Sequence, residues 1–181
     1  MSAARRQTAS ADGRTMSVGV TVAILVDSTA VTPPEDPAAA ARALLAAENI
    51  GVLSTISVHR PGYPYGSVTP YALSAEGAPL LLFSRLAAHT RNLAADPRAG
   101  LFVGDRSAAA DPQAGARVSL LGQVRPVPDA AVADARARYL ARHPQAADYF
   151  ALGDFSLWRF DIEEARLIAG FGEIRWLPGP L

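Results

Sequence analysis

The chain has 181 residues, enough for one ordinary domain with a buried core and too few for two of the usual size. Its formal net charge is zero, which argues against a nucleic-acid partner because phosphate binding needs a surplus of basic residues. The chain contains no Cys, so disulfides, iron–sulfur clusters and thiolate catalysis are excluded.

All 17 basic residues are Arg, and Lys does not occur. A Schiff-base lysine and a phosphate loop with its lysine are therefore excluded. Any bound phosphate has to be held by Arg, His, hydroxyl or backbone N–H groups. The bias itself is most simply explained by codon usage, because the chain is also rich in Ala.

The first 35 residues show no stable helical or strand period, so we predict a mobile N-terminal tail at 1–35. The apolar run Val18–Val26 is far shorter than the roughly 20 residues that span a bilayer, and no membrane partner is expected. Arg5 and Arg6 ahead of this run leave a secretory signal open as an alternative, and Met16 is a second possible start. The favoured tail and the absence of Cys predict a cytoplasmic protein.

Residues 36–181 are predicted to form one folded domain. It begins at Asp36-Pro37, because Asp as N-cap and Pro in the first turn both suit the unpaired N–H groups of a helix start. Consecutive strands with helices at the corners favour an antiparallel α+β barrel over a doubly wound sheet. The predicted elements are a helix at Ala38–Glu48, strands at Ile50–Val58, Gly66–Ser74 and Pro79–Ser84, a helix at Ala87–Ala95, strands at Ala99–Gly104 and Ala116–Pro126, a helix at Asp129–Arg142 capped by Asp129, and strands at Phe155–Ile162 and Leu167–Trp176 separated by Glu163–Arg166.

Two prolines, Pro64 and Pro70, fall just before and within the second predicted strand. Because proline cannot donate a ladder hydrogen bond, this strand is predicted to lie at an edge or to carry an irregularity. Irregular backbone with free N–H and C=O groups suits the polar rim of a flat heterocycle. The nearby tyrosines Tyr63, Tyr65 and Tyr71 are equally compatible with core or dimer-contact positions.

The segment Leu82–Leu93 joins a strand to a helix and is rich in phosphate-binding groups. A helix N-terminus offers unpaired N–H groups and the positive end of the helix dipole. Hydroxyl, imidazole and guanidinium donors surround that point, and an ordinary strand-to-helix turn with surface arginines is the alternative interpretation. The donors are Ser84, Arg85, His89, Thr90 and Arg91, with Asn92 further along.

Taken together, these residues resemble the pyridoxamine 5′-phosphate oxidase-like FMN-binding split barrels, and within them the branch that contains haem-degrading proteins. The likeness keeps its order and spacing from Asp36 to Trp176. The matching segments are Gly51–Ser57, Gly62–Ser67, Ser84–Leu93, Asp96–Arg98, Asp111-Pro112, Arg117–Gly122, Arg138–Leu140, His143-Pro144, Asp154-Phe155 and Gly170–Gly172.

The resemblance implies an α+β split β-barrel, antiparallel and Greek-key-like, with helices at its corners. It also implies a homodimer that holds FMN at the subunit interface. By the same resemblance, the flavin ring edge lies against Ser67, Val68 and Thr69, and the phosphate lies among Ser84, Arg85, His89, Thr90 and Asn92. Arg117 matches a polar position that faces the flavin. The segment Gly170-Phe171-Gly172 approaches the cofactor of the partner subunit.

The family likeness predicts an FMN-dependent oxidoreductase acting on a small molecule, in which the flavin supplies the electron chemistry. The absence of Lys argues against pyridoxal phosphate production. A haem-binding or haem-degrading protein is an alternative, weakened because no His follows His143. A flavin-free interaction protein of the same fold is the other alternative, since fold does not fix function.

Overall fold

The computed structural model describes residues 36–169 and 174–181. The predicted tail at 1–35 and the Gly170-Phe171-Gly172 segment lie outside these residues. The elements in chain order are α1 (Pro37–Ala47), β1 (Ile50–Ile56), β2 (Pro64–Leu73), β3 (Pro79–Ser84), α2 (Ala88–Ala95), β4 (Arg98–Gly104), η1 (Arg106–Ala108), β5 (Arg117–Pro126), α3 (Asp129–Arg142), η2 (Pro144–Ala146), α4 (Ala147–Ala151), β6 (Phe155–Ile168) and β7 (Ile174–Pro178).

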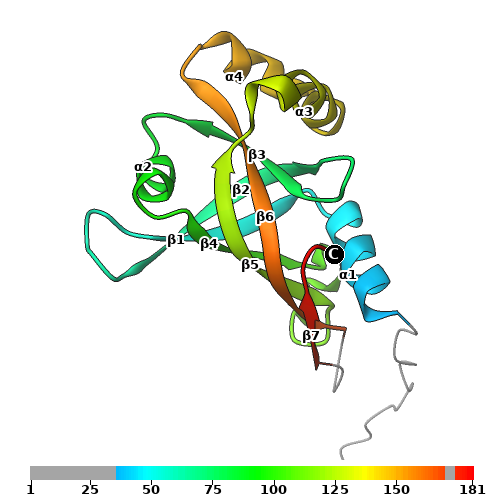
Figure 1. Ribbon diagram of the computed structural model, residues 1–181. Coiled ribbons are helices and arrows are strands. Elements are labelled where there is room, and N and C mark those ends of the chain that lie inside the picture. The colour runs from blue at the N-terminus through cyan, green and yellow to red at the C-terminus, as the bar shows by residue number, and fades with distance from the viewer. Residues whose placement is uncertain (1–35, 170–173) are drawn as a thin grey trace, which may run out of the picture. The chain divides into compact units, whose positions relative to one another are not determined.

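The strands form one antiparallel sheet in the order β3-β2-β1-β4-β5-β6-β7, and β3 also pairs with β6. This extra pairing closes β1 to β6 into a barrel and leaves β7 as an added strand beside β6 (Figure 1). The predicted α+β split barrel with helices at its corners is therefore confirmed. Within the described residues, no helix is long and apolar enough to cross a membrane.

Helix α1 forms where the sequence predicted it, with its ends shifted by one residue. The Asp36 carboxylate accepts hydrogen bonds from the N–H groups of Ala38 and Ala39 at 2.9 and 3.1 Å. These bonds satisfy donors that a helix start otherwise leaves unpaired. At the other end, the Arg142 guanidinium donates to the carbonyl groups of the last turn, which fixes α1 to α3.

Strand β2 pairs with different neighbours along the two parts of its length. It pairs with β1 from Pro64 to Pro70, whereas its pairing with β3 covers only Tyr71–Leu73. Both prolines therefore fall where β2 has a neighbour on one side, as the edge or irregular strand predicted from them requires. This one-sided stretch is the split in the barrel, and it leaves backbone groups of β2 without a strand partner.

The last two strands differ from the prediction, because β6 continues through Glu163–Arg166. Leu121 of β5 pairs with Glu164, while the next residue, Gly122, pairs with Ile162, so Glu163 is an extra residue in β6. Such a β-bulge puts two successive side chains on the outside and breaks the alternation that marks a strand. The prediction that this polar run separates two strands is for this reason wrong, and Ala165 within it is buried in the core.

Helix α3 begins at Asp129 itself, with Pro128 as the N-cap, so the prediction that Asp129 caps this helix is wrong. Its carboxylate still lies in the first turn, where the helix dipole favours negative charge. The inner faces of α3 and η2 cover a second apolar cluster on β2, β3 and β6. That cluster contains Ala72, Leu80, Val127, Ala135, Tyr139, Ala146 and Leu157.

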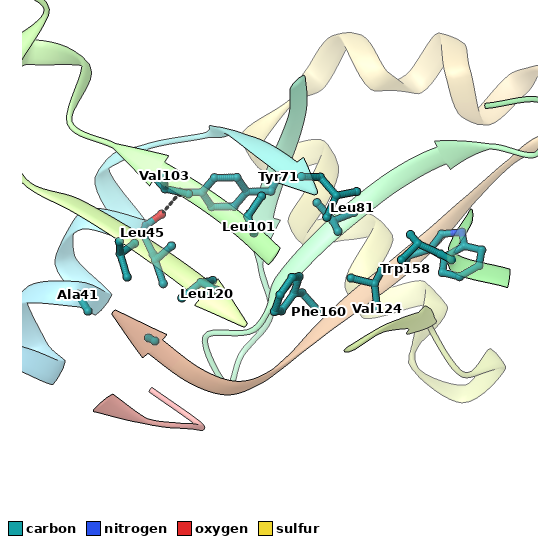
Figure 2. Close-up of a cluster of buried hydrophobic side chains, with 14 of the residues drawn as sticks. Ala41, Leu45, Tyr71, Leu81, Leu101, Val103, Leu120, Val124, Trp158 and Phe160 are labelled. Carbon is teal, nitrogen blue, oxygen red and sulfur yellow. Dashed lines mark hydrogen bonds between the residues drawn. The ribbon is translucent and has the colours of Figure 1, made fainter. Parts of the chain in front are cut away.

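The main core fills the barrel interior and is shared by all six barrel strands and α1 (Figure 2). Tyr71 is buried there, and its hydroxyl donates to the Leu45 carbonyl at 2.8 Å. Burial raises the pKa of this phenol. Because this core fills the barrel interior, a binding site has to lie on the outer face of the barrel or at the split.

Candidate functional site

The outer face of β1 is more apolar than its inner face. Alternate residues point inward, and these include Gly51 and Thr55, whereas Ile50, Val52 and Ile56 point outward. Val68 on β2 and Phe102 on β4 extend this surface and are 73% and 44% exposed. An exposed apolar patch of this kind marks a surface that a ligand or another protein covers.

Two recesses lie on this face, and Phe102 lines both. The first, which we call the Gly100 recess, measures about 550 Å³ and is edged by Ile56, Leu121 and Arg98. The second, the Arg117 recess, measures about 580 Å³. Both volumes fall in the range of small-molecule sites. The lining of the Arg117 recess includes Ile50, Val52, Val68, Phe102, Arg106 and Arg117.

Arg106 and Arg117 both line the Arg117 recess, and the guanidinium group of each is held by the protein. Arg106 donates from Nε to the buried Glu48 carboxylate at 2.5 Å and from Nη2 to Asn49 at 2.9 Å. Arg117 donates from Nη1 to the carbonyls of Gln113 and Gly115 at 2.9 and 3.1 Å. Each guanidinium carries five N–H donors, so both keep donors for a ligand. An apolar recess with arginines at its rim suits a flat ring that carries carboxylates or phosphate.

The junction of β3 and α2 brings together four of the five residues expected at a phosphate, but their hydroxyl groups are already bonded. Ser84 Oγ donates to Asp154 Oδ2 at 2.6 Å and accepts from the N–H of Leu86 at 3.1 Å. Thr90 Oγ1 donates to the Ser84 carbonyl at 2.7 Å. The Asp154 carboxylate therefore places a negative charge inside the cluster, where a bound phosphate would repel it.

The remaining groups of this junction are better placed for an anion. Helix α2 has Ala87 as its N-cap, and no side chain there accepts from the first turn. The Arg85 side chain is exposed, while Arg91 donates to the Leu86 carbonyl at 2.7 Å. His89 is half-buried against the Phe83 ring with centroids 4.4 Å apart, and burial lowers its pKa. A neutral imidazole is therefore favoured near pH 7.

Asn92 lies apart from the other expected phosphate ligands and ties α2 to β1. It is 2% exposed. Its side-chain oxygen accepts from the N–H of Val58 at 3.0 Å, and its nitrogen donates to Thr55 Oγ1 at 2.9 Å. With these bonds made inside the protein, Asn92 holds the helix that carries His89 and Thr90.

The three residues expected at a flavin ring edge follow each other on the one-sided stretch of β2. Val68 points outward and lines the Arg117 recess together with Arg117. Thr69 is buried, and its hydroxyl donates to the Pro70 carbonyl at 3.2 Å. Ser67 is half-buried. Tyr71 of β2 pairs with Leu81 of β3, and this register, if it continued, would place Val68 opposite Ser84. The residues expected at the flavin edge and those expected at the phosphate therefore lie on opposite sides of the split.

Phe102, Arg106 and Asp154 belong to these surfaces but were not among the predicted site residues. A sequence signal exists for Phe102, because it alternates with Gly100 and Gly104 on one face of a strand. Such an aromatic beside glycines at outward positions indicates a recess. Across residues 36–169 and 174–181, no cluster of three or more His, Cys, Asp or Glu residues could hold a metal ion.

The closed barrel and its one-sided β2 define an antiparallel split β-barrel. The chain belongs to the CREG β-barrel family, whose family model matches residues 32–180. A pyridoxinephosphate oxidase family protein from Clostridium acetobutylicum shares the fold with a TM-score of 0.60 at 16% identity, over 79% of this chain and 96% of that one.

Two relatives are closer in sequence. Over 129 residues the chain is 37% identical to the "Non-canonical heme oxygenase HOZ, chloroplastic" of Arabidopsis thaliana, covering 71% of this chain and 39% of HOZ. A heme binding protein from Mycobacterium smegmatis is 36% identical with a TM-score of 0.74, over 82% of this chain and 60% of that one. This chain therefore spans less than two thirds of the length of either relative.

Proposed function

We propose that this chain binds haem in the Arg117 recess on the outer face of the barrel, as one half of a homodimer. The observation that carries the proposal is the recess itself, an apolar surface edged by Arg106 and Arg117. Haem is a flat apolar ring with two carboxylates, and arginine is the residue best suited to hold carboxylates. The names of the two relatives at 36 and 37% identity support this choice.

The residues fit the ring and its carboxylates but not the iron. Val52, Val68 and Phe102 would contact the ring, and the two arginines would hold its carboxylates. Among the described residues that line the recess, none is a His, Tyr or Met. When bound, haem supplies iron redox chemistry. Because this recess offers no ligand for the iron, the proposal covers haem binding and does not extend to haem degradation.

FMN is the second candidate, and one observation favours it. The uncapped first turn of α2 and the exposed Arg85 lie at the split, as a phosphate site requires. There the stretch of β2 at Ser67 and Val68, which pairs with β1 but not with β3, would face the polar rim of the flavin. Flavin would supply hydride or electron transfer, making the chain an oxidoreductase of an unidentified small molecule. The Asp154 carboxylate beside Ser84 argues against FMN, because it would repel the phosphate.

Titration of the cofactor-free protein with haemin and, separately, with FMN tests both candidates. We expect a shifted haem absorption band that saturates at one haem per chain. Arg106→Gln and Arg117→Gln should each weaken haem binding about tenfold, the loss of one charge-assisted contact. Arg125→Gln is the matched control, an exposed arginine on the same strand as Arg117 but outside the recess.

Three other outcomes are informative. If Arg106→Gln and Arg117→Gln both leave haem binding unchanged, haem binds outside the Arg117 recess. Tight FMN binding that Arg85→Gln weakens, with no haem binding, would make the second candidate correct. A chain that binds neither cofactor would support a flavin-free interaction protein. The homodimer is measured separately by sedimentation, and the cytoplasmic location stays a prediction.

A further inference from the structure

A buried carboxylate outside the Arg117 recess, that of Glu48, binds Arg106. Glu48 is 8% exposed, and it does not line the recess, whereas Arg106 does. The backbone of Glu48 is held in place, because its N–H donates to the Leu44 carbonyl of α1 and its carbonyl accepts from Arg142 at 3.2 Å. A buried carboxylate has to be paired, and both of its oxygens accept from Arg106.

The Glu48 carboxylate holds the backbone and the side chain of Arg106 together. One oxygen accepts from the Arg106 backbone N–H at 3.1 Å, and the other accepts from its Nε at 2.5 Å. Nη2 of the same guanidinium donates to the side-chain oxygen of Asn49 at 2.9 Å. These bonds hold a long side chain at its base and at its end. Arg106 is therefore kept in one orientation, although 58% of its side chain is exposed.

The bonds to Glu48 and Asn49 use one edge of the Arg106 guanidinium and leave another edge open. Nε and Nη2 share the bonded edge of this planar group, and neither of their partners lines the recess. Asp105, the acidic residue in the recess lining, directs its carboxylate to the N–H and hydroxyl of Ser107. The edge formed by Nη1 and Nη2 is thus available, and it carries two parallel N–H donors that match a carboxylate.

We propose that Glu48 is the positioning residue that fixes Arg106 in the orientation that binds a planar carboxylate in the Arg117 recess. The inference rests on the proposed function and names the residue that orients one of its two arginines. An arginine that is free before binding loses side-chain freedom when it binds, whereas one already held in place does not. Glu48 therefore strengthens binding of the ligand without contacting it.

The negative charge of Glu48 has the opposite effect on an anionic ligand. As a charge, the carboxylate repels the anion and lowers the net positive charge beside the recess. Glu48→Gln removes this repulsion, but its amide has one oxygen in place of two, so one of the two bonded N–H groups of Arg106 then faces an NH2 donor. A role in positioning predicts weaker binding of a carboxylate ligand by this variant, whereas charge alone predicts tighter binding.

Titration with protoporphyrin IX and with its dimethyl ester measures this effect without iron. The two probes share one ring, and only the first carries free carboxylates. Glu48→Gln should weaken binding of the acid about fivefold and leave binding of the ester unchanged. A role in the fold alone would weaken binding of both probes equally. Asp134→Asn is the matched control, because it removes the carboxylate paired with Arg138 on α3, outside the recess, and it should change neither affinity.

The double variant of Glu48 and Arg106 shows whether one residue acts through the other. In an Arg106→Gln background, Glu48→Gln should have no further effect on binding of the acid, because the arginine that it positions is missing. Melting curves verify the folding of each variant. The proposal is overturned if the losses from the two substitutions simply add, or if Glu48→Gln binds the acid as tightly as the wild type or more tightly.

The Nε–H proton of Arg106 provides a measurement on the wild-type protein without any ligand. Its bond to the buried Glu48 should slow its exchange with water at least about tenfold relative to the exposed Arg125. Nitrogen-15 NMR measures both rates, and the Arg106→Gln variant identifies the signal. Equal rates would contradict the positioning. If the wild type binds neither porphyrin while this proton stays protected, the proposed function fails and the positioning of Arg106 by Glu48 is supported.

Discussion

The hydroxyl of Ser84 at the end of β3 donates a 2.6 Å hydrogen bond to the carboxylate of Asp154, just ahead of β6. The bond joins positions 70 residues apart, and the N–H of Arg85 also donates to the Asp154 carbonyl. The strand-to-helix junction is thus fixed to the last barrel strand. It also carries a carboxylate at the point where a phosphate would bind.

Asp154→Asn should raise the affinity of the chain for FMN about fivefold, because it removes a negative charge beside the α2 N-terminus while the amide oxygen still accepts from Ser84. Fluorescence quenching of FMN measures the change. Asp148→Asn, an exposed carboxylate at the start of α4, is the control. An unchanged FMN affinity in Asp154→Asn would show that the phosphate does not bind at this junction.

Asn92→Ala should lower the free energy of unfolding by about 2–3 kcal/mol, because it leaves the N–H of Val58 without a partner and removes the donor to the buried Thr55 hydroxyl. Asn49→Ala removes one exposed hydrogen bond, to Arg106, and should cost about 0.5 kcal/mol. Urea denaturation of both variants measures the difference. Equal losses would mean that Asn92 does not hold α2 to β1.

Two glycines of the sheet should respond very differently to alanine. A Cβ at Gly122 would lie 2.0 Å from the Asp161 carbonyl oxygen, whereas a Cβ at Gly66 has no neighbour closer than 3.8 Å. Gly122→Ala should therefore cost about 3 kcal/mol or more, and Gly66→Ala less than about 1 kcal/mol. Thermal unfolding compares them. A small effect at Gly122 would show that the bulge at Glu163 relaxes freely.

The stability of the fold should depend on His89 below neutral pH. Because burial lowers the pKa of His89 in the folded protein, the unfolded chain binds a proton more readily. The stabilising contribution of the neutral imidazole is therefore complete above the ordinary pKa of about 6.5, and it is lost as the pH falls below that value.

His89→Gln should accordingly reduce the loss of unfolding free energy between pH 7.5 and pH 5.5. His59→Gln, in the exposed turn after β1, is the matched control for loss of an imidazole. Denaturant titrations at the two pH values provide the comparison. A His89→Gln profile that matches the wild type would contradict burial as the cause.

Local patterns were enough to predict most elements of this fold. The Asp36-Pro37 start of α1 and the prolines of β2 act through neighbouring residues, so their consequences can be read from short segments. The bulge at Glu163 could not be predicted in this way, because it depends on the pairing of β6 with Gly122 of β5. The sequence there differs little from that of a polar turn.

The candidate site was predicted less completely than the fold, for the same reason. Family resemblance indicated the junction residues, but the bond from Ser84 to Asp154 spans 70 positions and leaves no local mark. The Arg117 recess combines residues from β1, β2, β4 and β5. Only the register of the sheet brings Phe102 beside Val52.

Closure of the barrel by β3 and β6 has a consequence for synthesis of the chain. Leu80 of β3 pairs with Arg159 of β6, so one edge of β3 stays unpaired until β6 has been synthesised. During translation the apolar residues of β1 to β5 are exposed until residues 155–168 have left the ribosome, and such non-local pairing is slow and prone to aggregation. A nascent chain stalled before β6 should depend on chaperones for solubility. A chain stalled on an added C-terminal linker that carries residue 181 out of the ribosome should already resist proteolysis.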